Sequence, residues 1–358
     1  MAKIYVLNNY SFERVWQEIR AGKKPNHHLY GVNYLAEAGH EVVLVPFDEE
    51  KKSIWSRFSK FWKKSKLPIP LGDLFQQFYV LKRAKKEDVI YAPCQTQTQL
   101  LSYLKAIGLV RAKIIVLAHH PPIRGRFAKV RQFFFRWELR GTDAYPALSQ
   151  RIADRINQFQ KGKSKGLHWG PDLKFYAPYL SNQATYFLAA GRTGRDFNNF
   201  AAACVEAHAP AKIICLQNDY DNHLKTYEAN PNINITANAA EASYLYDQLT
   251  PVMAASKAIC IPLFATKSNL AGLTSLTDAL ALGKAVLMTR NDFIDIDIEA
   301  EGIGIWLPAK DRAAWQAAIE KLHNDPRLCA EMGRKAKALG EQFWNSKVFA
   351  RELLALIT

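Results

Sequence analysis

Two short stretches in the second half of the chain carry residue types suited to binding a phosphorylated ligand. In the first, NLAGLTSLTDALALGKAV over 269–286, Gly272, Thr274 and Ser275 open a predicted helix. Small hydroxyl residues and free backbone N–H groups at a helix start form an anion site. Asp278 follows one turn later on the same face, where its carboxylate would accept hydrogen bonds from ribose hydroxyls. The same residues would equally serve as a helix cap and a complement to the helix dipole.

The second stretch, AAGRTGRDF over 189–197, follows a predicted strand and contains Gly191, Arg192, Thr193 and Arg195. Arginine presents a planar fork of N–H donors that matches phosphate oxygens. Two such side chains at a tight strand-to-helix turn would hold a phosphate. A surface ion pair between Arg195 and the aspartate that follows it, with Arg192 solvated, explains the same residues equally well.

Tandem histidines end a predicted strand in the first half of the chain. The sequence VLAHHPP over 116–122 places His119 and His120 at the carboxyl end of that strand. An imidazole there would act as a general base or contact a donor phosphate. The alternative is a fixed turn with one histidine packed and the other exposed. If neither histidine is the base, that role falls to a carboxylate such as Asp143 or to the substrate itself.

The elements that must position these residues alternate along the chain. Amphipathic stretches predict helices, and apolar runs between them predict strands at 3–8, 41–47, 88–93, 113–120, 185–191, 212–218, 258–263, 285–290 and 304–308. Buried strands interleaved with helices indicate parallel, doubly wound sheets, which bind ligands at the carboxyl ends of their strands. The pattern runs through two sets, so we expect domains at 1–178 and 179–340, followed by a helix within 341–358 that packs back on the first domain.

Taken in order, these motifs resemble the group 1 glycosyltransferase superfamily of the GT-B fold. TDALALGKAV over 277–286 is similar to the end of that family's nucleotide-sugar segment, with Asp278 at its second acidic position. The Gly-Arg turn at 191–192 resembles the turn that leads to its diphosphate site. HWGPDLKFY over 168–176 resembles its domain junction, and PNHHLYGVNYLAEAGHEVVLV over 25–45 resembles its first helix and second strand.

The resemblance implies two Rossmann-like domains that face each other across a cleft, the first for an acceptor and the second for a nucleotide diphosphate sugar. The implied activity is hexosyltransferase-like and metal-independent, with a UDP-sugar favoured over a GDP-sugar and no cofactor besides this donor. Side chains and a helix dipole would neutralise the leaving diphosphate. His119 and His120 would be catalytic, and the donor would be bound by Gly191, Arg192, Thr193, Arg195, Gly272, Thr274, Ser275 and Asp278.

One position departs from the family pattern. Leu270 lies where the family often has a glutamate that contacts the donor sugar. The acidic loop over 291–304 offers Asp295, Asp297 and Glu299 as substitutes, or it is only a solvated loop. The identity of the sugar and the retaining or inverting outcome therefore stay open.

The net charge of +15, from 48 Lys and Arg against 33 Asp and Glu, favours an anionic partner. KKSIWSRFSKFWKKSK over 51–66 and RGRFAKVRQFFFRWELR over 124–140 each combine an aromatic stripe with basic residues. This pattern suits an anionic membrane surface, whereas two core helices or a site for single-stranded nucleic acid are the alternatives. Because the first domain would hold the acceptor, we expect a lipid-linked glycan or glycolipid acceptor and a peripheral enzyme on the cytoplasmic face of the cell membrane.

The remaining features narrow the class of protein. None of the five cysteines forms a CxxC pair, no window of the sequence is apolar enough for a transmembrane helix, and the start does not read as a signal peptide. No other motif indicates nucleic-acid binding, so no nucleic-acid partner is expected. Two alternatives stay open, namely a GT-B nucleotide-sugar epimerase and a non-catalytic protein that binds an anionic ligand such as nucleic acid.

Overall fold

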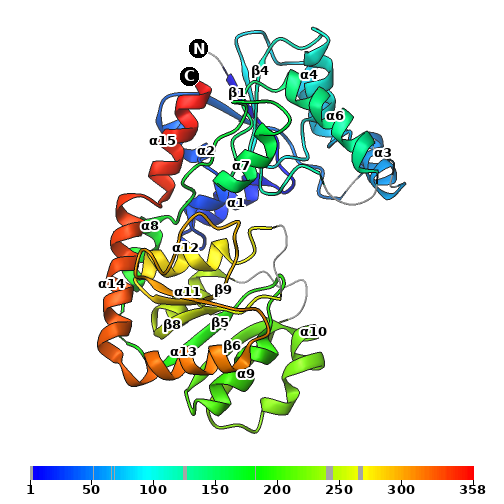
Figure 1. Cartoon of the computed structure of the whole chain (residues 1–358). Coiled ribbons are helices and arrows are strands. Elements are labelled where there is room, and N and C mark those ends of the chain that lie inside the picture. The colour runs from blue at the N-terminus through cyan, green and yellow to red at the C-terminus, as the bar shows by residue number, and fades with distance from the viewer. Residues whose placement is uncertain are drawn as a thin grey trace. The chain divides into compact units, whose positions relative to one another are not determined.

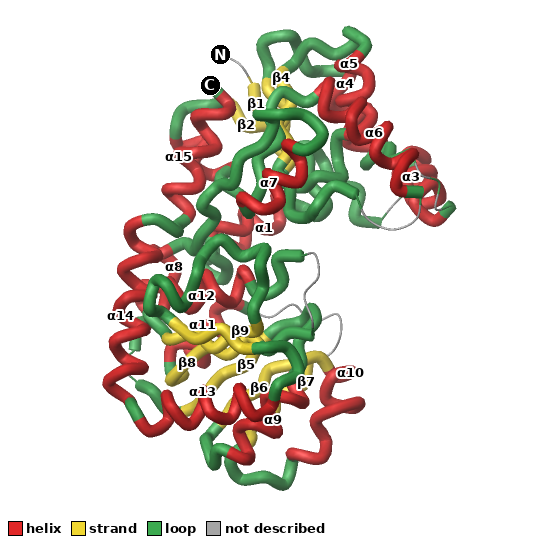
Figure 2. Tube along the Cα trace, in the orientation of Figure 1, coloured by secondary structure: helices red, strands yellow, loops and turns green. Residues whose placement is uncertain are grey.

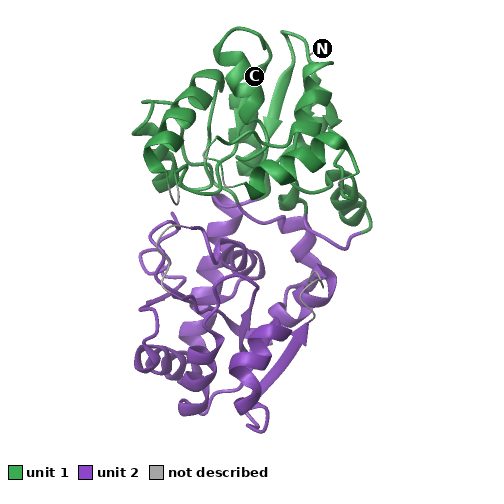
Figure 3. Ribbon diagram, turned by 90° about the vertical axis from the view of Figure 1, so that its right-hand side faces the viewer, with its two compact units in different colours: residues 1–21, 26–169, 346–358 green, residues 22–25, 170–345 purple. Residues whose placement is uncertain are grey.

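The chain folds into two compact units, shown in green and purple in Figure 3. The structure is a computed structural model that describes residues 3–50, 52–65, 67, 69–123, 127–181, 183–238, 245–264 and 269–358. Unit 1 comprises residues 1–21, 26–169 and 346–358, and unit 2 comprises residues 22–25 and 170–345. The boundary therefore lies at 169–170, upstream of the expected 178, and the segment that returns to unit 1 begins at Ser346.

Unit 1 is built on a parallel four-stranded sheet in the order β2-β1-β3-β4. The strands are β1 (Lys3–Val6), β2 (Glu41–Leu44), β3 (Val89–Ala92) and β4 (Lys113–Val116). β3 is buried throughout, and β1 and β4 after their first residue, as apolar strands between helical layers should be. The helices are α1 (Phe12–Arg20), η1 (Asn26–Leu29), α2 (Val32–Glu37), α3 (Ile54–Lys64), α4 (Leu74–Leu81), α5 (Gln99–Ala106), α6 (Ala128–Gly141), α7 (Gln150–Asn157) and α15 (Ser346–Ile357).

Unit 2 is built on a parallel six-stranded sheet in the order β10-β9-β8-β5-β6-β7. Its strands are β5 (Tyr186–Ala190), β6 (Ala211–Leu216), β7 (Ile233–Asn238), β8 (Ser256–Ile261), β9 (Ala285–Thr289) and β10 (Gly304–Leu307). Figure 2 shows α11 and α12 on one side of this sheet and α9 and α13 on the other. The main helices are α8 (Leu173–Tyr176), α9 (Phe197–Glu206), α10 (Gln217–Asp219), α11 (Tyr246–Ala254), α12 (Leu273–Leu282), α13 (Arg312–Asn324) and α14 (Pro326–Gln342).

The prediction of two doubly wound parallel sheets is confirmed, and one strand was missed. β7, with the sequence INITAN, lies at the edge of the unit 2 sheet and pairs only with β6 among the described strands. An edge strand is buried on fewer sides, so polar residues alternate with apolar ones along it. A search for continuous apolar runs therefore passes over such a strand.

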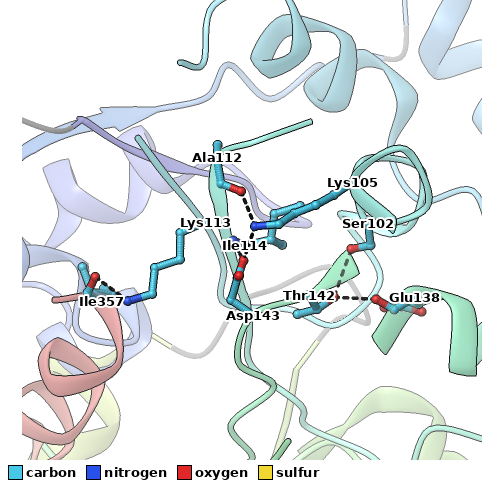
Figure 4. Close-up of polar contacts among 9 residues, drawn as sticks. All are labelled: Ser102, Lys105, Ala112, Lys113, Ile114, Glu138, Thr142, Asp143 and Ile357. Carbon is cyan, nitrogen blue, oxygen red and sulfur yellow. Dashed lines mark hydrogen bonds and ion pairs between the residues drawn. The ribbon is translucent and has the colours of Figure 1, made fainter. Parts of the chain in front are cut away.

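α15 lies far from the rest of unit 1 in the sequence but belongs to that unit. The Tyr34 and Ser346 hydroxyls lie 2.9 Å apart and tie the start of α15 to α2. At the other end, Lys113 Nζ donates to the Ile357 carbonyl at 2.9 Å, as Figure 4 shows. Within the described part of the chain, no helix is both long and apolar enough to cross a bilayer.

Candidate functional site

The strand order of each sheet reverses at one place, and that place locates the candidate site. In unit 2, β5 lies between β6 and β8, so the chain continues from β5 to a strand on one side and from β8 to a strand on the other. Open α/β sheets bind ligands in the crevice that opens outside the carboxyl ends of such strands. The loop after β5 contains Gly191, Arg192, Thr193 and Arg195, and the segment after β8 leads into α12. Both predicted donor stretches thus reach the same edge of the sheet.

Arg195 is the buried centre of this site, with only 9 % of its surface exposed. Its Nε donates to the Ala190 carbonyl at 3.3 Å, its Nη1 to the Thr193 carbonyl at 3.2 Å and its Nη2 to Ser275 Oγ at 3.0 Å. The guanidinium also packs on Gly191, where an added Cβ would lie 2.5 Å from Arg195 Nε. Glycine therefore leaves the room that Arg195 needs to link the turn after β5 to the start of α12.

α12 begins without a side-chain cap, and this leaves donors free at its first turn. Its N-cap is Gly272, at φ 91° in the left-handed region that favours glycine. The N–H of Leu273 donates to the Leu270 carbonyl, whereas those of Thr274 and Ser275 have no acceptor among the described residues. Two such N–H groups at the positive end of a helix, beside a buried guanidinium, attract an anion.

The structure thus brings the predicted residues of both stretches together through the bond between Arg195 and Ser275. Arg192 and Thr193 are exposed at the tip of the turn. The alternative ion pair of Arg195 with Asp196 is not what the structure shows, because Asp196 is the N-cap of α9 and accepts from the Asn199 N–H. These contacts make a phosphate site chemically feasible, and the donor roles of the individual residues stay predictions.

Asp278 lies one turn after Thr274 on α12, and its carboxyl is buried with a partner of its own. Its carboxyl is 4 % exposed, and the Tyr176 hydroxyl of α8 donates to its Oδ1 at 2.5 Å. Burial raises the pKa of Asp278 to about 7, and the bond from Tyr176 only partly offsets this rise. The carboxyl therefore has a buried phenol as its partner, and the predicted contact with a ribose stays a prediction.

The raised pKa of Asp278 predicts a specific dependence of stability on pH. The native state holds a proton on this carboxyl that the unfolded chain releases near pH 4, so the contribution of Asp278 to stability is lost as the pH rises from about 4 to 7. Asp278→Asn should remove this loss. The difference in free energy of unfolding between the variant and wild type should therefore shift in favour of the variant as the pH rises from 4 to 8. Urea unfolding at both values measures the difference, with Asp311→Asn as the control. If the free energy of unfolding of wild type and of Asp278→Asn changed in parallel with pH, the raised pKa of Asp278 would be contradicted.

His119 and His120 follow β4 at the carboxyl edge of the unit 1 sheet. His119 Nε2 lies 2.6 Å from the Pro93 carbonyl, and the imidazole must be the donor because a carbonyl only accepts. Burial of the half-buried ring is the main reason that the pKa of His119 falls to about 4; the bond to Pro93 raises this pKa and the charge of His120 lowers it. His119 is therefore neutral near pH 7, whereas the His120 side chain is exposed.

This pKa bears on the two roles that the sequence left open for His119. A general base works best when its pKa lies near the working pH. A neutral imidazole with a pKa near 4 is a weak base but still accepts a hydrogen bond through its unprotonated nitrogen. The lowered pKa therefore argues against removal of a proton by His119, and contact with a substrate group stays a prediction.

Asp143, the alternative base, occupies the opposite end of β4. Its Oδ2 accepts the N–H of Ile114 at 2.6 Å and also pairs with Lys105, as Figure 4 shows. Ligands of a parallel sheet bind at the carboxyl ends of its strands, and Ile114 is near the amino end of β4. Asp143 therefore supports the sheet and lies away from the histidines.

The carboxylates of the acidic loop have structural partners as well. Asp297 Oδ1 accepts the indole N–H of Trp306 at 3.0 Å, and Glu299 Oε1 accepts the backbone N–H of Trp306 at 3.1 Å. Both bonds hold the loop onto β10. Asp295 is exposed. None of these bonds indicates that the loop binds the donor sugar in place of the glutamate that the family often has at the position of Leu270.

Two residues that the sequence did not single out shape these sites. Tyr176 holds the Asp278 carboxyl, and Gln95 contacts the backbone of both histidines. The only sequence signal for Gln95 is its place in a polar run, CQTQTQ, directly after a buried strand. In the described part of the chain, no group of three His, Cys, Asp or Glu side chains is arranged to hold a metal ion.

No protein-family model matches the sequence, and no curated protein matches it significantly. Solved structures do match. A glycosyltransferase from Rickettsia africae is 12 % identical, with a TM-score of 0.68 over 99 % of this chain and 97 % of that one. HepE from Anabaena, in complex with UDP-glucose, is 14 % identical, with a TM-score of 0.64 over 99 % of both chains. Sucrose-phosphate synthase from Thermosynechococcus elongatus is 12 % identical, with a TM-score of 0.62 over 99 % of this chain and 98 % of that one. Identities this low show a shared fold.

Proposed function

We propose that this chain, which has the GT-B fold of the three matching structures, is a glycosyltransferase that uses a UDP-sugar. The observation that supports the proposal is the contact of Arg195 with Ser275 in unit 2, beside the two backbone N–H groups of α12 that have no acceptor among the described residues. A nucleotide diphosphate needs positive charge and N–H donors of this kind. The preference for UDP is supported by HepE, whose structures hold UDP, UDP with glucose, and UDP-glucose.

The residues of the site suggest how the transfer would be helped. When the bond from the sugar to the diphosphate breaks, negative charge develops on the leaving oxygen. The guanidinium of Arg195 and the start of α12 are fixed before the reaction, so they stabilise that charge without reorganising. We propose that these groups neutralise the leaving diphosphate without a metal ion, while unit 1 holds the hydroxyl of the acceptor.

The function is tested by coupling ligand binding to product formation. UDP, UDP-glucose, UDP-N-acetylglucosamine and GDP-mannose would first be screened by thermal shift, because a ligand of the native state raises stability. UDP release would then be followed with and without a polyprenyl-phosphate-linked monosaccharide or a diacylglycerol glycolipid. Release that requires an acceptor supports a transferase, whereas a change of the sugar without an acceptor supports an epimerase. Thermal shifts by none of these nucleotides would contradict the donor site.

The acceptor proposal rests on the way α3 packs in unit 1. The only buried residue of this helix is Ser56, and Ser59 Oγ accepts the N–H of Leu74 at 3.1 Å. Trp55 and Trp62 also contact the protein, because the Trp55 ring centroid lies 4.5 Å from that of Phe78 and the Trp62 indole N–H donates to the Ile69 carbonyl at 2.8 Å. The apolar residues Ile54 and Phe61 of this helix are 74 % and 66 % exposed, which is the reverse of a core helix. The interpretation of 51–66 as a core helix therefore does not hold for Ile54 and Phe61, whereas Trp55 and Trp62 do pack on the protein.

The aromatic residues of α6 divide between two directions, so the single stripe predicted over 124–140 is corrected. Phe134 and Trp137 pack on Tyr103, with ring centroids 6.0 and 5.0 Å apart. Phe133 is instead 63 % exposed, as are Phe127 and Val130 to a smaller degree. Figure 1 shows α3 and α6 at the same side of unit 1. Residues 51, 66 and 124–126 of the two predicted segments lie outside the described residues.

The charges around α3 indicate which partner fits its apolar face. Arg57, Lys60, Lys63 and Lys64 are all exposed, and no acidic residue lies on the helix. Apolar side chains flanked by cations match the boundary between headgroups and acyl chains of an anionic bilayer. We propose that this face holds the enzyme on the inner surface of the cell membrane and that the acceptor is a lipid-linked glycan or glycolipid.

Replacing Ile54, Phe58 and Phe61 together by serine should reduce binding to phosphatidylglycerol vesicles by about tenfold or more, because each side chain loses an apolar contact worth about 1.5–3 kcal/mol. The variant should stay folded and keep its affinity for nucleotide, because Ile54 and Phe61 are largely exposed and Phe58 is partly so. Co-sedimentation at low and high salt is the measurement, and salt should reverse only the electrostatic part.

The matched control for this variant is Phe343→Ser, which removes an exposed aromatic residue from unit 2. It should leave vesicle binding unchanged. If wild type stays in the supernatant at both salt concentrations, the membrane proposal fails. Tighter binding to single-stranded RNA than to the vesicles would instead favour the nucleic-acid alternative.

A further inference from the structure

One side chain of unit 1 makes three hydrogen bonds to the tandem histidines. Gln95 lies in the loop after β3, and its Oε1 accepts the backbone N–H groups of His119 at 2.7 Å and His120 at 2.9 Å. Its Nε2 donates to the His120 carbonyl at 3.0 Å. Gln99 in turn donates to the Gln95 carbonyl at 2.8 Å. The loop after β4 is thus held by the loop after the neighbouring strand.

The same β3 loop also fixes the imidazole of His119. Pro93, two residues before Gln95, accepts a hydrogen bond from His119 Nε2, so the proton of the neutral ring is on Nε2. The ring packs on Tyr30, with centroids 4.9 Å apart, and Tyr30 stacks on Trp169 at 5.9 Å. The other nitrogen, Nδ1, has no hydrogen-bond partner among the described residues and is not one of the fully buried polar atoms.

We propose that Gln95 is a positioning residue that, with the Pro93 carbonyl, holds His119 in one orientation and one tautomer, with the lone pair of Nδ1 available to a substrate hydroxyl. We call the bonds of Gln95 and Pro93 to the two histidines the clamp. The nature of the substrate rests on the proposed function, whereas the geometry of the clamp does not. Gln95 acts through the backbone and Pro93 acts through the ring, so removing Gln95 frees the peptide that carries His119. The ring then loses its fixed distance from Pro93.

The neighbouring residue His120 differs from His119 in just these respects. Gln95 bonds both the backbone N–H and the carbonyl of His120. The His120 side chain is nevertheless exposed, and its ring centroid is 6.5 Å from that of His119. The clamp therefore distinguishes two adjacent histidines that the sequence could not rank. His119 is the one with a fixed ring and an open acceptor nitrogen.

Nitrogen NMR of the full chain, with ¹⁵N-labelled histidine, tests the clamp without any assay of activity. The signals of His119 would be assigned by their loss in His119→Asn. Wild type should show a neutral ring with its proton on Nε2, and Gln95→Ala should show signals averaged between the two tautomers. Gln95→Glu keeps acceptors for both N–H groups and loses only the donor to the His120 carbonyl, so it should restore the single tautomer. The control is Gln97→Ala, whose side chain donates to Thr96 within the same loop.

Turnover supplies the second readout. Gln95→Ala should lower turnover of UDP-glucose with a glycolipid acceptor by about tenfold to a hundredfold, as misplacement of a substrate-contacting group does, with UDP affinity unchanged, and Gln95→Glu should recover part of it. The proposal is overturned if wild-type His119 carries its proton on Nδ1, or if Gln95→Ala keeps both the tautomer and the turnover of wild type. If Gln95→Ala does not fold, the tautomer of wild type and the behaviour of Gln95→Glu still decide. An inactive wild type would contradict the proposed function alone, because the NMR result stands apart from it.

Discussion

Arg195→Ala is expected to weaken the binding of UDP by about tenfold to a hundredfold, because charge-assisted hydrogen bonds to phosphate are worth about 1.5–3 kcal/mol each. The effect should exceed that of Arg192→Ala, since Arg192 is exposed whereas Arg195 is buried and joins the turn after β5 to Ser275. Isothermal titration calorimetry measures both affinities. Circular dichroism and melting curves report whether the folded state is kept.

Two further variants separate the charge of Arg195 from its shape. Arg195→Lys keeps the charge but not the planar fork that reaches three acceptors, so its affinity for UDP should lie between those of wild type and Arg195→Ala. Arg312→Ala removes an exposed guanidinium that pairs with Glu206 on the same unit and should change nothing. If Arg192→Ala and Arg195→Ala both bind UDP like wild type, the phosphate site lies elsewhere.

His119→Ala is expected to lower turnover by about a hundredfold at saturating donor, because a substrate group misplaced by about 1 Å loses rate on that order. The variant should bind UDP normally, because the proposed phosphate site is in unit 2 and His119 is in unit 1. His119→Asn places an amide oxygen near the position of Nδ1 and should lose less. His120→Ala should have a small effect, because that side chain is exposed.

The pH profile gives a check on the role of His119. Because burial holds the pKa of His119 near 4, this residue stays neutral from pH 6 to pH 8 and should add no inflection to the rate in that range. Wild type and His119→Asn should therefore show parallel profiles between those values. Full turnover in His119→Ala would remove the residue from the site, and an inflection near pH 6.5 that only this variant lacks would show an unperturbed imidazole.

The fold was predictable because buried parallel strands are continuous apolar runs, and all the predicted runs correspond to strands of the two sheets. Tertiary environment was harder to predict. Arg195 was expected at the surface or on a ligand, and nothing in GRTGRDF indicates that its guanidinium is buried against Gly191. Asp278 shares a helical face with Thr274, yet α12 is buried continuously from Leu276 onward, so periodicity does not show which side meets solvent.

The helical wheel of α3 shows the same limit in another form. The pattern correctly separated an aromatic arc from a basic one, but a wheel does not say which arc packs on the protein. Ser56 and Ser59 contact the protein, and so do Trp55 and Trp62 of the aromatic arc, whereas Ile54 and Phe61 of the same arc are exposed. Gln95 was missed because a glutamine has no charge and no titratable group. Only its three hydrogen bonds to the histidine backbone indicate that it positions them.

The return of α15 to unit 1 has a consequence for synthesis of the chain on the ribosome. Unit 2 consists almost entirely of one continuous stretch, residues 170–345, so it can fold soon after this stretch emerges. Unit 1 must wait, since Lys113 and His168 find their partners Ile357 and Glu352 only after all of unit 2 has been translated. Until then the unit 1 surface that α15 covers stays open to other chains. A premature stop after residue 345 would therefore damage the unit made first and spare the one made second.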